Sequence, residues 1–222
     1  IGIAFARTIL GTLLTLMCCS FAAYILANRD LPCRKLLYRF FIITMYVNAG
    51  FIPYYLLISN IKLKNNFLVY ILPYAVQAYF IILIKTYIES IPGELVESAE
   101  MDGAGLVKVF FRIILPLAKP ILACIVVFAA VHQWHTWSDD MFFMQERKAA
   151  NLHCLQYLLY TKLQSNVVST TGTGAAAGAA VKVTSTTLRM AMSFITVVPI
   201  LCVYPYMQRF FTKGIMLGAV KG

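Results

Sequence analysis

Long apolar runs alternate with short polar connections along the whole chain. Five runs are long enough to cross a hydrocarbon layer as helices, which takes about 20 residues each. Runs of this length exceed an ordinary strand, and lipid requires each segment to satisfy its own backbone hydrogen bonds. The pattern therefore predicts an all-α, polytopic membrane protein with one domain over residues 1–222 and spans at about 3–27, 37–59, 67–88, 117–138 and 185–208.

Two connections between the predicted spans are long, at about 89–116 and 139–184. The second contains STTGTGAAAGAAVK, which is rich in glycine but lacks the Gly-Lys-Ser/Thr ending of a Walker A loop. Its GAAAG also fits the small-xxx-small pattern of packed helices. The polar start of the segment favours an external loop, and the arrangement of 165–184 stays open.

Composition supports the membrane assignment. The chain is 60% hydrophobic and only 13% charged, with a mean hydropathy of +0.76, whereas a soluble domain carries about 25% charge. The net charge of +10 is scattered between apolar runs, so it predicts positive cytoplasmic loops and excludes a nucleic-acid-binding face. Six cysteines without a CxxC pair indicate small buried side chains, neither a disulfide frame nor a metal site.

The distribution of cations predicts the orientation. Lysine and arginine concentrate in residues 28–39, in residues 85–119 and in the C-terminal tail, which five helices place on one side. By the positive-inside rule, 89–116 is cytoplasmic and 139–184 is external. Because the chain opens without Met in an apolar run, we expect it to lack its native start, and a helix before Ile1 would return the N-terminus to the cytoplasm.

The connection 89–116 interrupts the apolar pattern with acids and glycines. Pro92 and Glu94 suit the first turn of a helix, and Gly103 and Gly105 suit the turn that ends it. A second amphipathic run, 106–115, follows. The pattern predicts two short helices joined by a glycine turn, either a docking element for a protein or a solvated connector. It is too acidic to lie on an anionic membrane surface.

The motif in this connection resembles that of a known family. Glu97-Ser98-Ala99, three residues, Gly103, nine residues and Ile113-x-Leu115-Pro116 resemble the EAA motif of permease subunits of binding-protein-dependent ABC importers, with Ser98 where alanine is usual. IPGELVESAEMDGAG resembles the sugar permeases of this family. FIPYYLLISNIKL and FFTKGIMLGAVKG resemble a subgroup that imports complex oligosaccharides, chiefly in Gram-positive bacteria.

The resemblance implies a type I ABC importer permease of the bacterial plasma membrane that passes an oligosaccharide by alternating access. Its partners would be an ABC ATPase dimer, a second and different permease chain, and an extracellular solute-binding lipoprotein. This chain would catalyse nothing and bind no cofactor, because ATP and Mg belong to the ATPase. The implied coupling residues are Glu94, Glu97, Ser98, Ala99, Asp102, Gly103, Ile113, Leu115 and Pro116.

Polar residues inside the spans are candidates for the substrate path, because they are costly in lipid and tend to face a cavity or another helix. Trp134 and Trp137, three residues apart, are predicted to share a helix face, either stacking on sugar rings or forming an interfacial belt. His132 and His135 have the same spacing, but no further ligands are evident, so no metal site is predicted. The candidates are Asn48, Gln77, Tyr79, Trp134, His135 and Trp137.

Three other functions remain as alternatives. An importer of amino acids or peptides would share the EAA motif. An ion-coupled secondary transporter would need broken helices in two related halves or an intramembrane acid, and every Asp and Glu lies outside the centres of the predicted spans. A membrane scaffold would not need a loop with EAA spacing.

Overall fold

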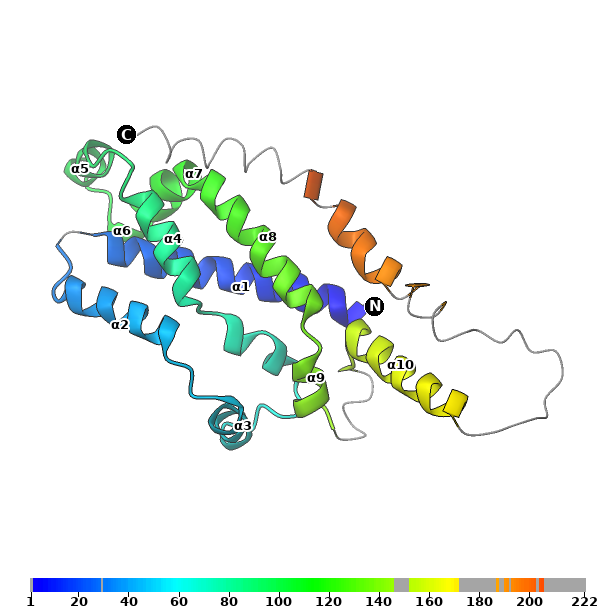
Figure 1. Ribbon diagram of the computed structural model, residues 1–222. Helices are drawn as coiled ribbons and strands as arrows, with labels where there is room; N and C mark the ends of the chain where they lie inside the picture. The colour runs from blue at the N-terminus through cyan, green and yellow to red at the C-terminus, as the bar shows by residue number, and fades with distance from the viewer. Residues whose placement is uncertain are drawn as a thin grey trace.

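The computed structural model describes residues 2–28, 30–145 and 152–171 and, toward the C-terminus, 187, 190–191, 193–202 and 204–205. These residues form helices and connections, without a strand among them (Figure 1). α1 (Gly2–Ala27) is the one described helix that is long and apolar enough to cross a membrane alone. Three bent helix pairs pass the same test together, so the described part contains up to four spans.

The remaining elements follow in chain order as α2 (Arg34–Tyr46), α3 (Phe51–Asn60), the 3-10 turns η1 (Phe67–Tyr70) and η2 (Leu72–Tyr74), α4 (Ala78–Ile88), α5 (Glu94–Met101), α6 (Leu106–Val109), the π-turn η3 (Phe110–Ile114), α7 (Leu115–Leu117), α8 (Lys119–His135), α9 (Ser138–Phe143), α10 (Leu155–Thr171) and the helix Ser193–Cys202.

α1 is the helix around which the others are arranged. α4 and α8 both pack along it (Figure 1). Small residues recur at every fourth position of its buried face, at Gly11, Thr15, Cys19 and Ala23, so neighbouring backbones can approach closely. The core that results joins α1 to Ile81 and Ile84 of α4, to Phe110 and Ile114 of η3 and to Leu122 and Ile125 of α8.

Two predicted spans are not straight helices. The run 37–59 is divided into α2 and α3, which meet at 113°, and the run 67–88 is divided at residues 75–77 with a bend of 45°. Gly50 at the first break has φ +83°, which favours glycine, and Pro73 lies in η2 shortly before the second. The apolar pattern is continuous through both breaks, so hydropathy alone does not mark where these helices are divided.

The bundle has two distinct ends. We call the end formed by α5, α6, the C-termini of α1 and α4 and the N-terminus of α2 the α5 end. We call the opposite one, formed by α9, α3, η1, the N-terminus of α1 and the start of α10, the α9 end (Figure 1). The predicted connection 139–184 and span 185–208 are described only in part, and STTGTGAAAGAAVK and the tail after 205 lie essentially outside the described residues.

Candidate functional site

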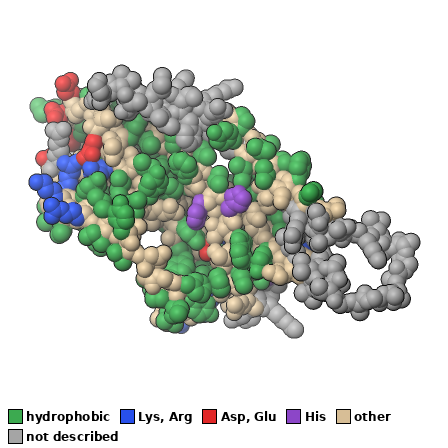
Figure 2. All heavy atoms as spheres, in the orientation of Figure 1, with side chains coloured by type: hydrophobic (Ala, Val, Ile, Leu, Met, Phe, Trp, Pro, Cys, Tyr) green, Lys and Arg blue, Asp and Glu red, His purple; other side chains and the backbone are tan. Residues whose placement is uncertain are grey.

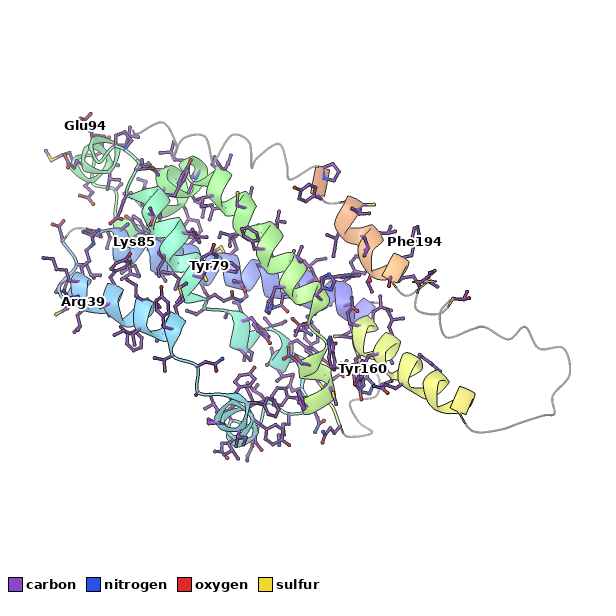
Figure 3. The ribbon with its side chains drawn as sticks, in the orientation of Figure 1. Arg39, Tyr79, Lys85, Glu94, Tyr160 and Phe194 are labelled. Carbon is purple, nitrogen blue, oxygen red and sulfur yellow. The ribbon has the colours of Figure 1, made fainter. Side chains whose placement is uncertain are left out.

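α5 is a short helix held against the bundle by one narrow edge. Val96 and Ala99 pack against the core of α1, α4 and η3. The rest of the helix is exposed, including Glu94, which projects from the tip of the molecule (Figure 3). Glu94 and Glu97 lie in the first turn, where negative charge is favoured by the helix dipole. The helix starts at Glu94, two residues after the expected Pro92.

A glycine ends α5 in a defined geometry. The Gly103 N–H donates to the Glu100 oxygen at 2.9 Å, and the Ala104 N–H donates to the Ala99 oxygen at 3.0 Å. These are the two bonds of a Schellman motif, which requires a left-handed residue after the helix. Gly103 fulfils this requirement with φ +77°, whereas Gly105 has an ordinary φ of −68°. Gly103 therefore sets the direction in which the chain leaves α5.

A cleft of about 410 Å³ separates α5 from the ends of α1 and α4. Arg34 pairs with Glu89 there and ties α2 to the end of α4, and Glu89 also pairs with Lys85, one turn earlier in the chain, at 2.8 Å. Glu97 and Glu100 also line the cleft, together with Asp30. The cleft thus carries more negative than positive side chains, which suits a basic group from a partner.

Exposed apolar side chains lie beside these acids. Met101 is 89% exposed, and Leu106, Val107 and Phe111 are each about half exposed. Gly105, Leu106, Val107 and Phe111 border an open depression together with Lys108 and Arg112. Apolar groups rimmed by charges are typical of protein-binding surfaces. Met101 was not among the site residues predicted from the sequence, although a methionine among acids on the polar face of a predicted helix was a usable signal.

The structure places the predicted coupling residues in two groups. Glu94, Glu97, Ser98, Asp102 and Gly103 are exposed on or next to α5, and Pro116 is exposed in α7. Ala99, Ile113 and Leu115 instead pack against the core of the chain itself. The Ser98 hydroxyl donates to the Glu94 oxygen at 2.7 Å, so serine at this position does not need a partner from another chain.

The α9 end contains a buried ionic network around Arg7. The Arg7 side chain is fully buried. Its Nη2 donates to Asp139 Oδ2 at 2.6 Å, its Nε to Gln133 Oε1 at 2.9 Å and its Nη1 to the Thr136 oxygen at 2.8 Å. The Tyr74 hydroxyl donates to the other oxygen of Asp139 at 3.0 Å. The sequence pattern places Arg7 at the edge of a span and gives no sign of this pairing.

A second buried carboxylate continues the network toward α10. Asp140 accepts the Cys154 N–H at 2.5 Å, and its Oδ1 lies 2.6 Å from His153 Nδ1. Burial raises the pKa of the Asp139 carboxyl, and the Arg7 guanidinium opposes this rise. Burial also raises the pKa of the Cys154 thiol. α1, α8, α9 and the start of α10 are therefore joined by buried polar contacts.

The predicted substrate-path residues do not form one group. Trp134 is buried against Phe5 and donates to the Thr196 oxygen at 3.1 Å, whereas Trp137 lies beyond the end of α8 and stacks on Tyr160. The prediction that the tryptophans share a helix face is wrong, because α8 ends at His135. The other four lie at the surface or partly buried, with Asn48 at the α2–α3 break, Gln77 and Tyr79 at the start of α4 (Figure 3) and His135 at the end of α8.

The described residues contain no group of three or more His, Cys, Asp or Glu side chains that could hold a metal ion. A bundle of apolar helices with an exposed, charged helix at one end is the architecture of a helical membrane protein.

Comparison with known proteins gives the family. Residues 5–137 match the family described as "binding-protein-dependent transport system inner membrane component". The chain belongs to this family and is an ABC importer permease of the inner membrane.

Individual relatives are similar to this protein over almost the whole chain. It is 32% identical to the polygalacturonan/rhamnogalacturonan transport system permease protein YtcP of Bacillus subtilis, over 97% of this chain and 74% of the relative. It is 29% identical to the melibiose/raffinose/stachyose import permease protein MelC of the same organism, over 100% and 77%. A crystal structure of a bacterial ABC transporter involved in the import of the acidic polysaccharide alginate matches with a TM-score of 0.78 and 26% identity, over 95% of this chain and 73% of that chain.

Proposed function

We propose that this permease carries an oligosaccharide, delivered by an extracellular binding protein, across the bacterial plasma membrane. The saccharides for which YtcP and MelC are named, and the alginate imported by the structurally similar transporter, support this class of cargo. The family description supports delivery by a binding protein. An importer of amino acids or peptides is the alternative within the family.

The observation that carries the mechanism is the exposure of α5. A helix attached by Val96 and Ala99 alone, with its acids and Met101 facing outward, fits a groove on a separate ATPase subunit. In this proposal Glu94, Glu97, Ser98, Asp102 and Gly103 contact the ATPase, and the cleft beside Glu97 receives a basic side chain. ATP and Mg are bound and used by the partner, and this chain contributes no catalytic group.

The same element is placed to pass motion into the bundle. α5 follows α4 directly and leads through α6 and η3 to α8, so both core helices connect to it. Tyr24 of α1 lies against Phe110 of η3, with ring centroids 5.5 Å apart. Ala99, Ile113 and Leu115 keep this junction packed. A displacement of α5 by the ATPase would therefore move α4 and α8 together, as alternating access between two permease subunits requires.

Reconstitution of the whole complex tests the proposal. The chain is assembled in proteoliposomes with its ATPase, a second permease and the binding protein, and ATP hydrolysis and sugar uptake are measured together. We expect sugar-loaded binding protein to stimulate hydrolysis, and charge reversal by Glu97→Lys to abolish the stimulation while membrane insertion is unchanged.

The matched control is Glu100→Lys. Glu100 lines the same cleft but is not among the predicted coupling residues, so a smaller effect is expected. Full stimulation in the Glu97→Lys complex would reject the coupling role of α5. Stimulation by an amino acid or peptide in place of a sugar would favour the alternative cargo.

A further inference from the structure

One face of α8 carries polar side chains away from its packing partner. Its buried residues Leu122, Ile125, Ala129 and Gln133 lie against α1. Phe128, His132 and His135 form a separate exposed stripe, because residues three and four apart share a helix face. Figure 2 shows histidine side chains gathered in the middle of one face of the bundle, among hydrophobic side chains.

The depth of this stripe makes contact with lipid unfavourable. His132 lies thirteen residues after Lys119 at the start of α8, which corresponds to about 20 Å along the helix axis. The hydrocarbon layer is about 30 Å thick, so the imidazole falls within the predicted span 117–138. Ionisable side chains at such depth face protein or a water-filled path.

The break between η2 and α4 leads to the same face. A helix break within a membrane needs other groups to satisfy its backbone, and α1 supplies them. Thr15 Oγ1 donates to the Tyr74 oxygen at 2.9 Å, and Cys19 Sγ lies 3.7 Å from the Ala75 oxygen and 3.4 Å from the Gln77 nitrogen. The break thereby holds Tyr74 beside α8, with the centroid of its ring 4.9 Å from that of His132.

The position of Tyr74 is fixed from the interior. Its hydroxyl donates to Asp139, and Asp139 is paired with the fully buried Arg7. Both charged residues are nine-tenths or more buried, so Tyr74 has little freedom to rotate away. The ring is only partly buried and remains next to the exposed imidazole.

We propose that Tyr74, Phe128, His132 and His135 form an oligosaccharide-contact subsite on the translocation path of this permease. Aromatic rings pack against the apolar faces of sugar rings, and an imidazole can both donate and accept hydrogen bonds to hydroxyl groups. The subsite rests on the proposed function, because it takes the same cargo. The two tryptophans have no part in it, since Trp134 is buried and Trp137 stacks on Tyr160.

The test separates transport from ATP hydrolysis in the complete complex. Tyr74→Leu and His132→Ala are reconstituted in proteoliposomes, and uptake of digalacturonate and raffinose is measured beside hydrolysis stimulated by the loaded binding protein. Loss of one ring contact in the path should lower uptake about tenfold and leave stimulated hydrolysis within about twofold of the parent complex. Tyr74→Phe keeps the ring and should retain more uptake than Tyr74→Leu.

Ile9→Ala is the control, because Ile9 is 63% exposed on α1; it should change neither readout. A parallel loss of uptake and hydrolysis in Tyr74→Leu and His132→Ala would overturn the subsite and indicate a structural or permease–permease contact. Unchanged uptake in both variants would also overturn it, while uptake by the parent complex would leave the proposed function intact. A parent complex that carries neither probe would overturn the proposed function and the subsite together.

Discussion

The two ends of the bundle use charge in opposite ways. At the α9 end, Arg7, Asp139 and Asp140 are buried, and each carboxylate accepts two polar contacts from other elements. At the α5 end, Glu94, Glu97 and Asp102 are exposed. Charges that are desolvated and paired fix one arrangement of helices, whereas solvated charges remain available to a partner. The α9 end therefore stabilises the bundle, and the α5 end is where we propose that the ATPase binds.

The two ends of α1 differ in the same way: its N-terminal part is closely packed, and its C-terminus is open to a cleft. Arg7 and Gln133 contact each other where Gly11 leaves room, and a β-carbon at Gly11 would lie 2.6 Å from Gln133 Nε2. At the opposite end of α1, the neighbouring cleft is open and lined by acids. The N-terminal half of α1 is therefore held by close packing and hydrogen bonds, whereas its C-terminus borders an open cleft.

The largest expected effect comes from breaking the buried pair. Arg7→Met leaves Asp139 in the interior without its cation, and removing one partner of a buried pair costs about 3–5 kcal/mol. Thermal unfolding of the purified chain in detergent should show a large loss of stability. Arg39→Met, at an exposed arginine of α2 (Figure 3), is the control and should change stability by less than about 0.5 kcal/mol.

The double variant Arg7→Met/Asp139→Leu sharpens this prediction. Replacing both charges with apolar groups removes the unpaired carboxylate, so part of the lost stability should return. Equal unfolding temperatures for the Arg7→Met and Arg39→Met proteins would contradict the view that the α9 end stabilises the bundle.

A smaller effect, on coupling, is expected at the α5 end. Gly103→Ala places a β-carbon at φ +77°, which costs about 1–2 kcal/mol. Gly105→Ala is a matched control two residues away, because its φ is −68° and neither glycine has an atom within 4 Å of an added β-carbon. Stimulated ATP hydrolysis in the complete complex should fall about tenfold for Gly103→Ala and change little for Gly105→Ala.

The melting temperature of the chain distinguishes the effect of Gly103→Ala from that of Arg7→Met. Gly103→Ala should lower the stability of the chain only by this strain of about 1–2 kcal/mol, which is less than the loss of about 3–5 kcal/mol expected for Arg7→Met. Equal hydrolysis by the two glycine variants would show that the Schellman geometry of α5 is not needed for coupling.

The smallest expected effect is a difference in the alkylation rates of two cysteines. Cys33 is exposed near the α5 end, whereas Cys154 is 2% exposed at the α9 end and its thiol pKa is raised by burial. A raised pKa keeps the thiol neutral and slows alkylation. In single-cysteine variants, a membrane-impermeant maleimide should label Cys33 from the cytoplasmic side only and should label Cys154 slowly and from the outside only. Rapid labelling of Cys33 from outside would reverse the predicted orientation.

Much of the architecture was predictable from the sequence. Apolar runs of spanning length predict membrane helices because lipid excludes unpaired backbone groups, and the family and fold comparisons confirm the all-α permease fold. The EAA spacing located α5, because glycines and acids between apolar runs are a local signal. The inward packing of Ile113 and Leu115 could not be predicted, because it depends on which side of each short helix meets the core.

The sequence by itself determined that the chain spans a membrane, which family it belongs to and where its charged helix lies, since these depend on composition and on residues adjacent in the chain. Only the tertiary structure decided the pairing of Arg7 with Asp139 and the contact of Tyr74 with His132. The first contact joins residues that are 132 positions apart in the chain, and the second joins residues that are 58 positions apart. Both form only when several helices pack together, because burial among those helices supplies the free energy that favours them.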